Sequence, residues 1–393
     1  MDLGIHGVEQ MRLLVFTSEY PPYGDTQVVH YFTRQWVKQG VEVDVVYQCD
    51  RLIFPLCYLT KNKVKRQPAG KMEQYTLEGV NVLKVPISRP IPNKRKRTPY
   101  TVHSAVKAIE KFTEGKKYDF VINHYCSYND YLVERTQSIF GVKKLAVFHG
   151  CDVGNHDLVR KIVSEYDYIA ARSDAIIRKL RDICECPDDV RRIDSGVPAE
   201  YLDGGMYHAP GYVYKFVYAG KLIKRKQVDQ ILEAAAMIGD QRRFFVEIIG
   251  DGTEKRRLEK LLKERRLEDK VRLLGALPRS ETYDHMKKAD CFVMVSIHET
   301  LGLVYLEAMS AGCLVIGSKG EGIDGIIRTG ENGFLVDPRN ICELRETMVK
   351  CMTMVESARK RIVTTSLETV KTMSDERVAR DYMSYIEACM ERT

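Results

Sequence analysis

The sequence predicts an α/β protein made of two doubly wound parallel-sheet domains in tandem, and three observations lead to this prediction. Short apolar runs alternate with segments of helical periodicity from residue 11 onward. This order repeats the β–α–β unit, which gives a parallel sheet with helices on both faces. A second series begins at residue 214, after the glycine- and proline-rich seam 198–212. In such pairs we expect the carboxyl ends of the strands to face each other across a cleft.

The first predicted domain spans residues 1–198 and is completed by residues 375–393. The run MRLLVFT at 11–17 has the length of a buried strand, and the apolar spacing over 28–39 predicts a helix that ends at Gly40. Further strands are expected at 41–47, 80–85, 120–123, 144–148 and 168–170, and further helices at 101–112, 128–139 and 173–183. The last helix, 375–390, is expected to cross back from the second domain and close the first.

The second predicted domain spans residues 199–374 and repeats the pattern from strand 214–219, YKFVYA. Its remaining strands are expected at 244–249, 271–274, 291–295, 314–317 and near 333–336. Its helices are expected at 228–238, 254–265, 279–288 and 304–311.

Composition excludes several classes of protein. Hydrophobic residues make up 44% and charged residues 29%, which is ordinary for a folded soluble protein and excludes a disordered chain. The eleven cysteines are scattered, and the only close pair, Cys184 and Cys186, lacks the second pair of a zinc site. No apolar run approaches the roughly 20 residues of a membrane span, and the first ten residues lack the features of a secretory signal. We therefore expect a cytoplasmic protein with reduced thiols.

The net charge of +7 is concentrated in one stretch of the first domain. Residues 61–117 hold 15 Lys/Arg and 4 Asp/Glu, a balance of 15 − 4 = +11. The apolar run LIFPLCYL at 52–59 precedes this stretch, and the cluster KRKR at 94–97 lies inside it. This pattern predicts peripheral docking on an anionic membrane surface through residues 52–97. The alternatives are a solvated surface loop and, for KRKR alone, nucleic-acid binding, although the sequence contains no recognised nucleic-acid module.

Two glutamates flank a predicted helix start in the segment SIHETLGLVYLEAMSAG at 296–312. Glu299 follows a buried strand, a loop with Gly302 comes next, and the helix that follows carries Glu307. The backbone N–H groups at a helix start favour phosphate, and a carboxylate on each side accepts hydrogen bonds from hydroxyls. This combination predicts a nucleotide-sugar pocket. The alternative is an ordinary strand–turn–helix with solvated acids.

Two further segments of the second domain point to a phosphate ligand. In YAGKLIKRK at 218–226 a strand ends, Gly220 opens a turn, and Lys221 and Lys226 follow. Two cations at a strand end can hold a diphosphate without a metal, each contributing about 1.5–3 kcal/mol. A basic solvated loop is the alternative. The segment IIGDG, with Gly250, is a strand that runs into a glycine turn and is weak evidence alone.

The order and spacing of these motifs resemble the retaining glycosyltransferases of family 4, also called group 1, which have the GT-B fold of two Rossmann-like domains. In that family the second domain reads G-R-L-x-x-x-K-G, then I-G-x-G, then E-x7-E followed by A-x-x-x-G. The resemblance covers nearly all of residues 11–390 and is strongest over 214–340. The matching positions are Gly220, Lys221, Leu222, Lys226, Gly250, Gly252, Glu299, Glu307 and Gly312.

The resemblance implies roles for these residues. Lys221 and Lys226 would bind the donor diphosphate, with Gly250 beside them, and Glu307 would bind the ribose hydroxyls. Glu299 and the backbone of Leu301, Gly302 and Leu303 would hold the donor sugar and the distal phosphate. Lys221 stands where the family has arginine, so the charge is kept but the bidentate fork is lost. Gln227 stands where the family has glycine. Thr300 and Leu301 replace the glycine or phenylalanine that usually follows the family's first glutamate, and this difference bears on the choice of sugar.

The first domain carries fainter family motifs. Gly24 in SEYPPYGD at 18–25 matches the opening loop that approaches the donor, whereas Asp25 replaces a second glycine. A carboxylate is unfavourable beside phosphates, so we assign Asp25 to the acceptor. His149 in FHGCD matches a His-Gly motif and would contact the donor sugar near the reacting carbon. His124, at a strand end, is either an acceptor-site residue or a structural one.

The implied activity is transfer of a hexosyl group from a nucleotide-diphosphate sugar, with UDP the commoner nucleotide, to a hydroxyl. No Asp-x-Asp lies at a strand end, so lysines and a helix start would neutralise the leaving diphosphate without a metal or another cofactor. Retention would follow a front-face route, and the two glutamates are not a glycosidase pair. With the basic segment, the expected acceptor is a lipid-linked or cell-surface glycan precursor at the inner membrane face. The alternatives are a GT-B sugar-nucleotide epimerase and a non-catalytic partner subunit.

Overall fold

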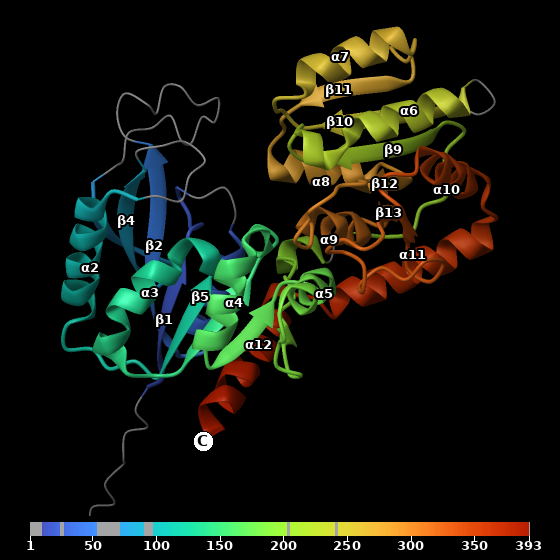
Figure 1. The fold of residues 1–393 in the computed structure, drawn as a ribbon. Coiled ribbons are helices and arrows are strands. Elements are labelled where there is room, and N and C mark those ends of the chain that lie inside the picture. The colour runs from blue at the N-terminus through green and yellow to red at the C-terminus, as the bar shows by residue number, and fades with distance from the viewer. Residues whose placement is uncertain are drawn as a thin grey trace, which may run out of the picture. The chain divides into compact units, whose positions relative to one another are not determined.

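The computed structural model describes residues 10–23, 27–52, 71–89, 97–202, 205–239 and 243–392. These residues form two compact units (Figure 1). The first unit contains the described residues of Met1–Ala171, Lys179–Ile193 and Val378–Thr393, and the second contains those of Arg172–Arg178 and Asp194–Arg377.

The first unit is built on an eight-stranded sheet in the order β3-β4-β2-β1-β5-β6-β7-β8. Its strands are β1 (Arg12–Thr17), β2 (Glu42–Leu52), β3 (Glu73–Leu77), β4 (Val80–Arg89), β5 (Phe120–His124), β6 (Lys144–Phe148), β7 (Tyr168–Ala171) and β8 (Arg191–Arg192). The central strand β1 pairs in parallel with β2 on one side and β5 on the other, as a doubly wound sheet requires. Among the described strands, the edge pair β3–β4 is antiparallel.

Helices cover the sheet of the first unit. They are α1 (Val28–Lys38), α2 (Pro99–Thr113), α3 (Cys126–Phe140), α4 (His156–Glu165), α5 (Asp174–Ile183) and α12 (Asp375–Glu391), of which α5 and α12 each begin in residues of the second unit. The predicted return of the last helix is confirmed. The indole nitrogen of Trp36 on α1 donates to the carbonyl of Ala379 on α12 at 2.9 Å, and the ring of Tyr382 packs edge-on against Trp36 at 5.1 Å.

Three elements of the first unit were not predicted, of which the two-residue strand β8 is the shortest. Strand β3 (EQYTL) is mostly exposed and polar, so it has no apolar run, and it forms through the tight turn at Glu78 and Gly79. Helix α4 buries only Val159 and Ile162 among its residues, although the side chain of Asn155 caps its start by accepting the Leu158 N–H at 3.3 Å. Strand β3 and helix α4 depend on tertiary pairing more than on apolar periodicity.

The second unit is built on a six-stranded sheet in the order β11-β10-β9-β12-β13-β14, and all its described pairs are parallel. The strands are β9 (Tyr214–Ala219), β10 (Phe244–Ile249), β11 (Val271–Gly275), β12 (Cys291–Val293), β13 (Leu314–Ser318) and β14 (Phe334–Val336). The helices are α6 (Val228–Ile238), α7 (Lys255–Glu264), α8 (Arg279–Lys287), α9 (Leu303–Ser310), α10 (Ile341–Thr353) and α11 (Glu356–Lys371). The expected fold class is therefore confirmed in each unit.

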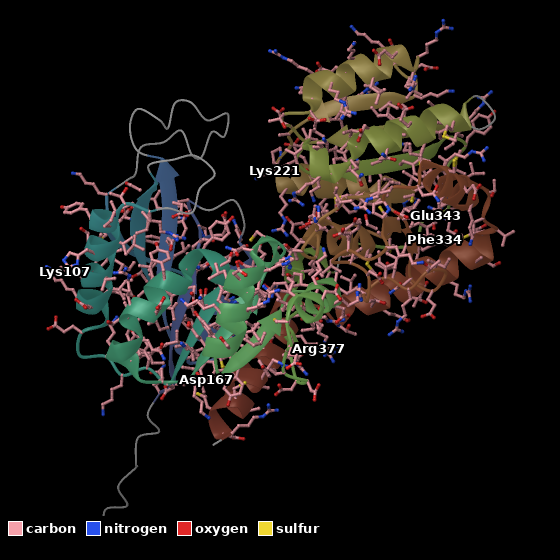
Figure 2. The ribbon with its side chains drawn as sticks, in the orientation of Figure 1. Lys107, Asp167, Lys221, Phe334, Glu343 and Arg377 are labelled. Carbon is pink, nitrogen blue, oxygen red and sulfur yellow. The ribbon has the colours of Figure 1, made fainter. Side chains whose placement is uncertain are left out.

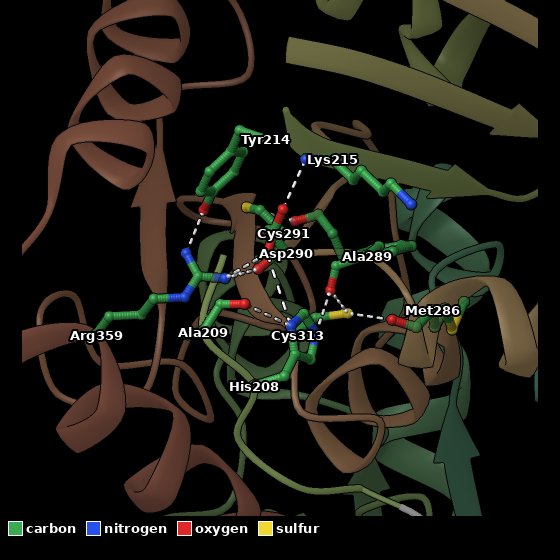
Figure 3. A network of polar contacts seen from close by, with 11 residues as sticks. His208, Ala209, Tyr214, Lys215, Met286, Ala289, Asp290, Cys291, Cys313 and Arg359 are labelled. Carbon is green, nitrogen blue, oxygen red and sulfur yellow. Dashed lines mark hydrogen bonds and ion pairs between the residues drawn. The ribbon is translucent and has the colours of Figure 1, made fainter. Parts of the chain in front are cut away.

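Helices α10 and α11 were not predicted. Helix α10, which carries Glu343 (Figure 2), starts where the Asn340 side chain accepts the N–H of Glu343 at 3.1 Å. Helix α11 is held by Arg359, whose guanidinium is 1% exposed and donates to the Tyr214 hydroxyl at 2.6 Å and the Asp290 carbonyl at 2.7 Å (Figure 3). The Asp290 carboxylate in turn accepts the N–H of Lys215 at 2.7 Å. This buried network ties α11 to the starts of β9 and β12, so it stabilises the end of the sheet away from the predicted site.

Candidate functional site

In the second unit, glycines let two strand-end loops touch backbone to backbone. Gly250, after β10, has φ +148°, and a Cβ there would lie 1.9 Å from the carbonyl oxygen of Gly220, after β9. A Cβ at Gly252 would lie 2.2 Å from the carbonyl oxygen of Leu222. Any side chain would push the loops apart, so these glycines fix the turn that carries the cations. Donor binding by Gly250 itself stays a prediction.

The predicted cations follow β9 in a short turn. Residues Lys224–Lys226 form a 3₁₀ turn that ends at Gln227, which adopts a left-handed conformation with φ +46°. This conformation favours glycine, which explains why the related family has glycine there. The side-chain amide of Gln227, oriented to donate, reaches the carbonyls of Val295 at 2.7 Å and Pro338 at 3.0 Å, and these hydrogen bonds help to hold the unfavourable conformation.

The two predicted lysines differ in exposure. Lys221 is exposed at the end of β9 (Figure 2), whereas Lys226 is buried. Burial lowers the pKa of the Lys226 ammonium, the charges of Arg225 and Lys221 lower it further, and the Glu299 carboxylate opposes them. The turn therefore concentrates positive charge around one buried ammonium group.

Glu299 is the anionic partner of this turn. Its Oε2 forms an ion pair with Lys226 Nζ, and it also accepts from Arg225 Nη1 at 3.1 Å and Ser296 Oγ at 3.2 Å. Burial raises the pKa of Glu299, but Lys226, Arg225 and Ser296 outweigh it and leave the pKa below its usual range. Sequence analysis identified Lys226 and Glu299 but missed Arg225, whose position in a run of basic residues gave no signal of a specific partner.

The loop between Glu299 and α9 is held from both sides. The backbone N–H of Glu299 donates to Glu321 Oε2 at 2.9 Å, and its carbonyl accepts from the N–H of Gly322 at 3.1 Å. Gly302 precedes α9 with φ +82°, and a Cβ there would lie 2.6 Å from the ring of Tyr305. Gly302 is thus required for the sharp start of the helix. Among the predicted donor contacts, the Leu301 side chain is buried, and Leu303 is the first residue of α9.

Glu307, on α9, is paired with an arginine that sequence analysis missed. Its Oε1 accepts from Arg279 Nη2 at 2.5 Å and Nε at 3.1 Å. Arg279 starts α8, and its guanidinium also lies over the ring of Tyr201, 4.8 Å from the centroid. Glu307 is therefore a held carboxylate, mostly buried, with hydrogen-bonding capacity beyond the Arg279 fork. The two predicted glutamates flank the start of α9, each oriented by basic side chains.

In the first unit, the two predicted histidines lie together. His124 is the last residue of β5, and His149 directly follows the neighbouring strand β6, so the sheet brings them to the same edge. His124 Nδ1 and His149 Nε2 are 3.2 Å apart. The buried Asp152 carboxylate fixes the His149 backbone by accepting its N–H at 2.6 Å, and it also accepts from Ser127 Oγ at 2.6 Å. Sequence analysis assigned the histidines to different ligands and did not predict their contact.

Other predicted residues of the first unit lie outside the described part of the chain. Gly24 and Asp25 are among them, as are most residues of the segment 52–97. Leu52, the first residue of its apolar run, is the last residue of β2. Arg97, the last residue of KRKR, donates to the carbonyl of Tyr128 at 2.7 Å, so part of its hydrogen-bonding capacity is used inside the unit.

Two family models together match most of the chain. Residues 24–201 match the model described as Glycosyltransferase Family 4, and residues 209–365 match the one described as Glycosyl transferases group 1. WcaL of Salmonella typhimurium, whose name places it in colanic acid biosynthesis, is 25% identical over 254 residues, 61% of each chain. The lipopolysaccharide core biosynthesis glycosyltransferase LpsE of Rhizobium meliloti is 34% identical over 118 residues, 30% of this chain and 33% of LpsE. The chain thus spans less than two thirds of either relative.

Solved structures resemble the whole chain. The structure of Anabaena Alr3699/HepE in complex with UDP-glucose superimposes with a TM-score of 0.67 at 14% identity, covering 96% of this chain and 100% of that one. At this identity the likeness establishes the fold. It agrees with the two mostly parallel sheets described above.

Proposed function

The chain belongs to the group 1 and family 4 glycosyltransferases and has their GT-B fold, and from this premise we propose that it is a retaining hexosyltransferase. It transfers a sugar from a UDP-sugar to a hydroxyl of a glycan or lipid-linked acceptor, without a metal ion. The observation that carries the proposal is the cluster of Lys226, Arg225 and Glu299 beside the start of α9, with Glu307 on that helix.

The cluster has the chemistry that a nucleoside diphosphate needs. Lys221, Lys226 and Arg225 supply positive charge that would offset the two phosphates, and the backbone N–H groups in the first turn of α9, which have no partner within the helix, add donors. Glu299 and Glu307 accept hydrogen bonds, which suits hydroxyls of the sugar and the ribose. Because basic side chains already orient both carboxylates, the donor would meet a preorganised site.

The proposed reaction replaces one bond at the anomeric carbon by another on the same face. The bond from this carbon to the phosphate oxygen breaks, and the leaving diphosphate takes up its electron pair beside the lysines. The acceptor oxygen bonds to the carbon on the same face, and its proton passes to the leaving phosphate oxygen. The cations thereby stabilise charge that develops in the transition state.

The names of similar proteins support the choice of donor and acceptor. The Anabaena Alr3699/HepE structures hold UDP or UDP-glucose, which favours a uridine donor. WcaL and LpsE are named for colanic acid and lipopolysaccharide core biosynthesis, which favours a cell-surface glycan acceptor.

A thermal-shift panel of nucleotides and nucleotide sugars tests the proposed function. We expect UDP and at least one UDP-sugar to raise the unfolding temperature, because a ligand at 100 times its Kd stabilises the folded chain by about 2.7 kcal/mol. Free hexose 1-phosphates, which lack the nucleoside, serve as controls and should give no shift. If no nucleoside diphosphate or nucleotide sugar changes the unfolding temperature, the proposal fails.

We also propose that the basic segment 52–97 docks the enzyme on an anionic membrane surface. Its sequence combines the apolar run at 52–59 with basic clusters, and each basic residue near such a surface contributes about 1 kcal/mol. Within the described residues, no helix is both long enough and apolar enough to span a membrane.

Vesicle sedimentation tests the docking. We expect the chain to sediment with phosphatidylglycerol-containing vesicles, and replacing the four residues of KRKR at 94–97 by serine to weaken that binding at least tenfold. A matched control replaces four exposed basic residues of the second unit by serine and should bind as wild type. Its positions are Arg256, Lys260, Lys263 and Arg266. Equal binding to neutral vesicles, or no binding, would refute docking.

A further inference from the structure

We propose that Tyr382 and His124 are positioning residues for His149, fixing which of its ring nitrogens carries the proton. The proposal rests on the proposed function, in which His149 contacts the donor sugar. Its structural basis is a chain of polar contacts that starts on the C-terminal helix α12 and ends at the His149 ring. This chain of contacts lies entirely in the first unit.

The chain of contacts consists of two links, each a polar contact between side chains. Tyr382 Oη lies 3.3 Å from His124 Nε2, and His124 Nδ1 lies 3.2 Å from His149 Nε2. His124 is 0%, Tyr382 2% and His149 3% exposed, so water does not compete freely for these atoms. Both nitrogens of His124 therefore have a protein partner, one on α12 and one after β6.

Aromatic neighbours restrain the rings of the chain. The ring of Phe32 stacks on His124 at 6.1 Å and meets Tyr382 edge-on at 5.2 Å. Tyr125 stacks on His149 with 3.7 Å between ring centroids and 19° between planes. Tyr125 holds this place from a left-handed conformation, φ +54°, which is unfavourable for a tyrosine. Turning either histidine ring out of its plane would break these stacks, so the planes of both rings are held.

The carbonyl of His124 is held as well. The side-chain amide of Asn129 on α3 donates to it at 2.7 Å. Together with the Asp152 contact to the His149 N–H, this fixes the backbone on both sides of the histidine pair. The two histidines of this chain of contacts are thus fixed at the ends of their strands by their backbone.

The links have a direction because a neutral imidazole offers one donor and one acceptor. A phenol is a good donor and an imidazole nitrogen a good acceptor, so the Tyr382 hydroxyl donates to His124 Nε2. His124 then carries its proton on Nδ1 and donates to His149 Nε2. His149 in turn carries its proton on Nδ1. In this form the Nδ1–H of His149 is a hydrogen-bond donor, and a donor suits an oxygen of the donor sugar.

The test replaces Tyr382 by phenylalanine, which keeps the ring contacts and removes the hydroxyl. Long-range ¹H–¹⁵N spectra of the full chain with ¹⁵N-labelled histidine report the tautomer directly. In the wild type we expect His149 protonated at Nδ1, and in Tyr382→Phe a mixture of both tautomers. We expect kcat of sugar transfer to fall about threefold to tenfold with little change in KM, because the ring stays in place. Tyr385→Phe, on the same helix, is the control and should change neither readout.

Two results would overturn the proposal. One is a wild-type His149 protonated at Nε2, and the other is a tautomer that stays the same in Tyr382→Phe. A second variant, His124→Phe, keeps an aromatic ring but breaks both links, and we expect it to give the same mixture of His149 tautomers. It provides the test if Tyr382→Phe folds poorly. The spectra report the His149 tautomer without any nucleotide sugar present. A nucleotide panel that gives no shift would therefore disprove the proposed function, whereas the tautomer measurement would still test the positioning of His149.

Discussion

Replacing Lys226 by methionine is expected to lower kcat/KM of sugar transfer by about 10²–10³-fold. Methionine keeps most of the length of the side chain but removes the ammonium group, and loss of one preorganised charge-stabilising group has this typical cost. Within the described part of the chain, the variant leaves the Glu299 carboxylate with Arg225 and Ser296 as its side-chain contacts, at 3.1 and 3.2 Å. The loss should therefore appear mainly in kcat, since the diphosphate charge develops as the sugar leaves.

Lys224→Met is the matched control for this prediction. Lys224 lies in the same 3₁₀ turn but is exposed, and its removal changes the net charge by the same amount. It should retain activity within about twofold, because exposed charges are well screened. Unfolding temperatures of all variants separate lost chemistry from lost folding. If Lys226→Met folds and keeps wild-type activity, Lys226 does not hold the leaving diphosphate.

Much of the fold was predictable because apolar periodicity reports buried strands and helices directly. Strand β1 has five buried residues in six, and its prediction differs from the structure by one residue. Of the elements that escaped prediction, strand β3 and helix α4 have little buried apolar surface of their own. Strand β3 is mostly exposed and forms by pairing with β4. Helices α10 and α11 each bury a few apolar residues within otherwise polar sequences, and the buried Arg359 of α11 meets the distant partners Tyr214 and Asp290.

The candidate site was predictable where motif spacing specifies a local structure. The spacing of Glu299, Gly302 and Glu307 describes a strand end, a turn and a helix, and the structure has all three. The partners of these residues were not predictable. Arg279 meets Glu307 from helix α8, 28 residues earlier, and only the packing of α8 on α9 determines that ion pair. The contact between His124 and His149 likewise depends on which strands are neighbours in the sheet.

Glu307 gives the second large effect that we expect. If its carboxylate binds the ribose hydroxyls, two charge-assisted hydrogen bonds are lost in Glu307→Ala, each contributing about 1.5–3 kcal/mol. UDP binding should then weaken by at least tenfold, since 1.4 kcal/mol corresponds to a factor of ten. Arg279 loses its carboxylate partner in this variant and can itself attract the diphosphate. A comparison of two ligands that differ only in the ribose removes this complication.

Calorimetric titration therefore tests the nucleotide site most directly. UDP and 2′,3′-dideoxy-UDP are each titrated into three proteins: the wild type, Glu307→Ala and Glu259→Ala, a control variant at an exposed site. For the wild type and Glu259→Ala we predict that UDP binds at least tenfold more tightly than the dideoxy ligand. For Glu307→Ala we predict equal affinities, because the hydroxyls no longer have their acceptor. A preference for UDP that is the same in all three proteins would contradict the assignment of Glu307 to the ribose and, with it, the placement of the donor at the start of α9.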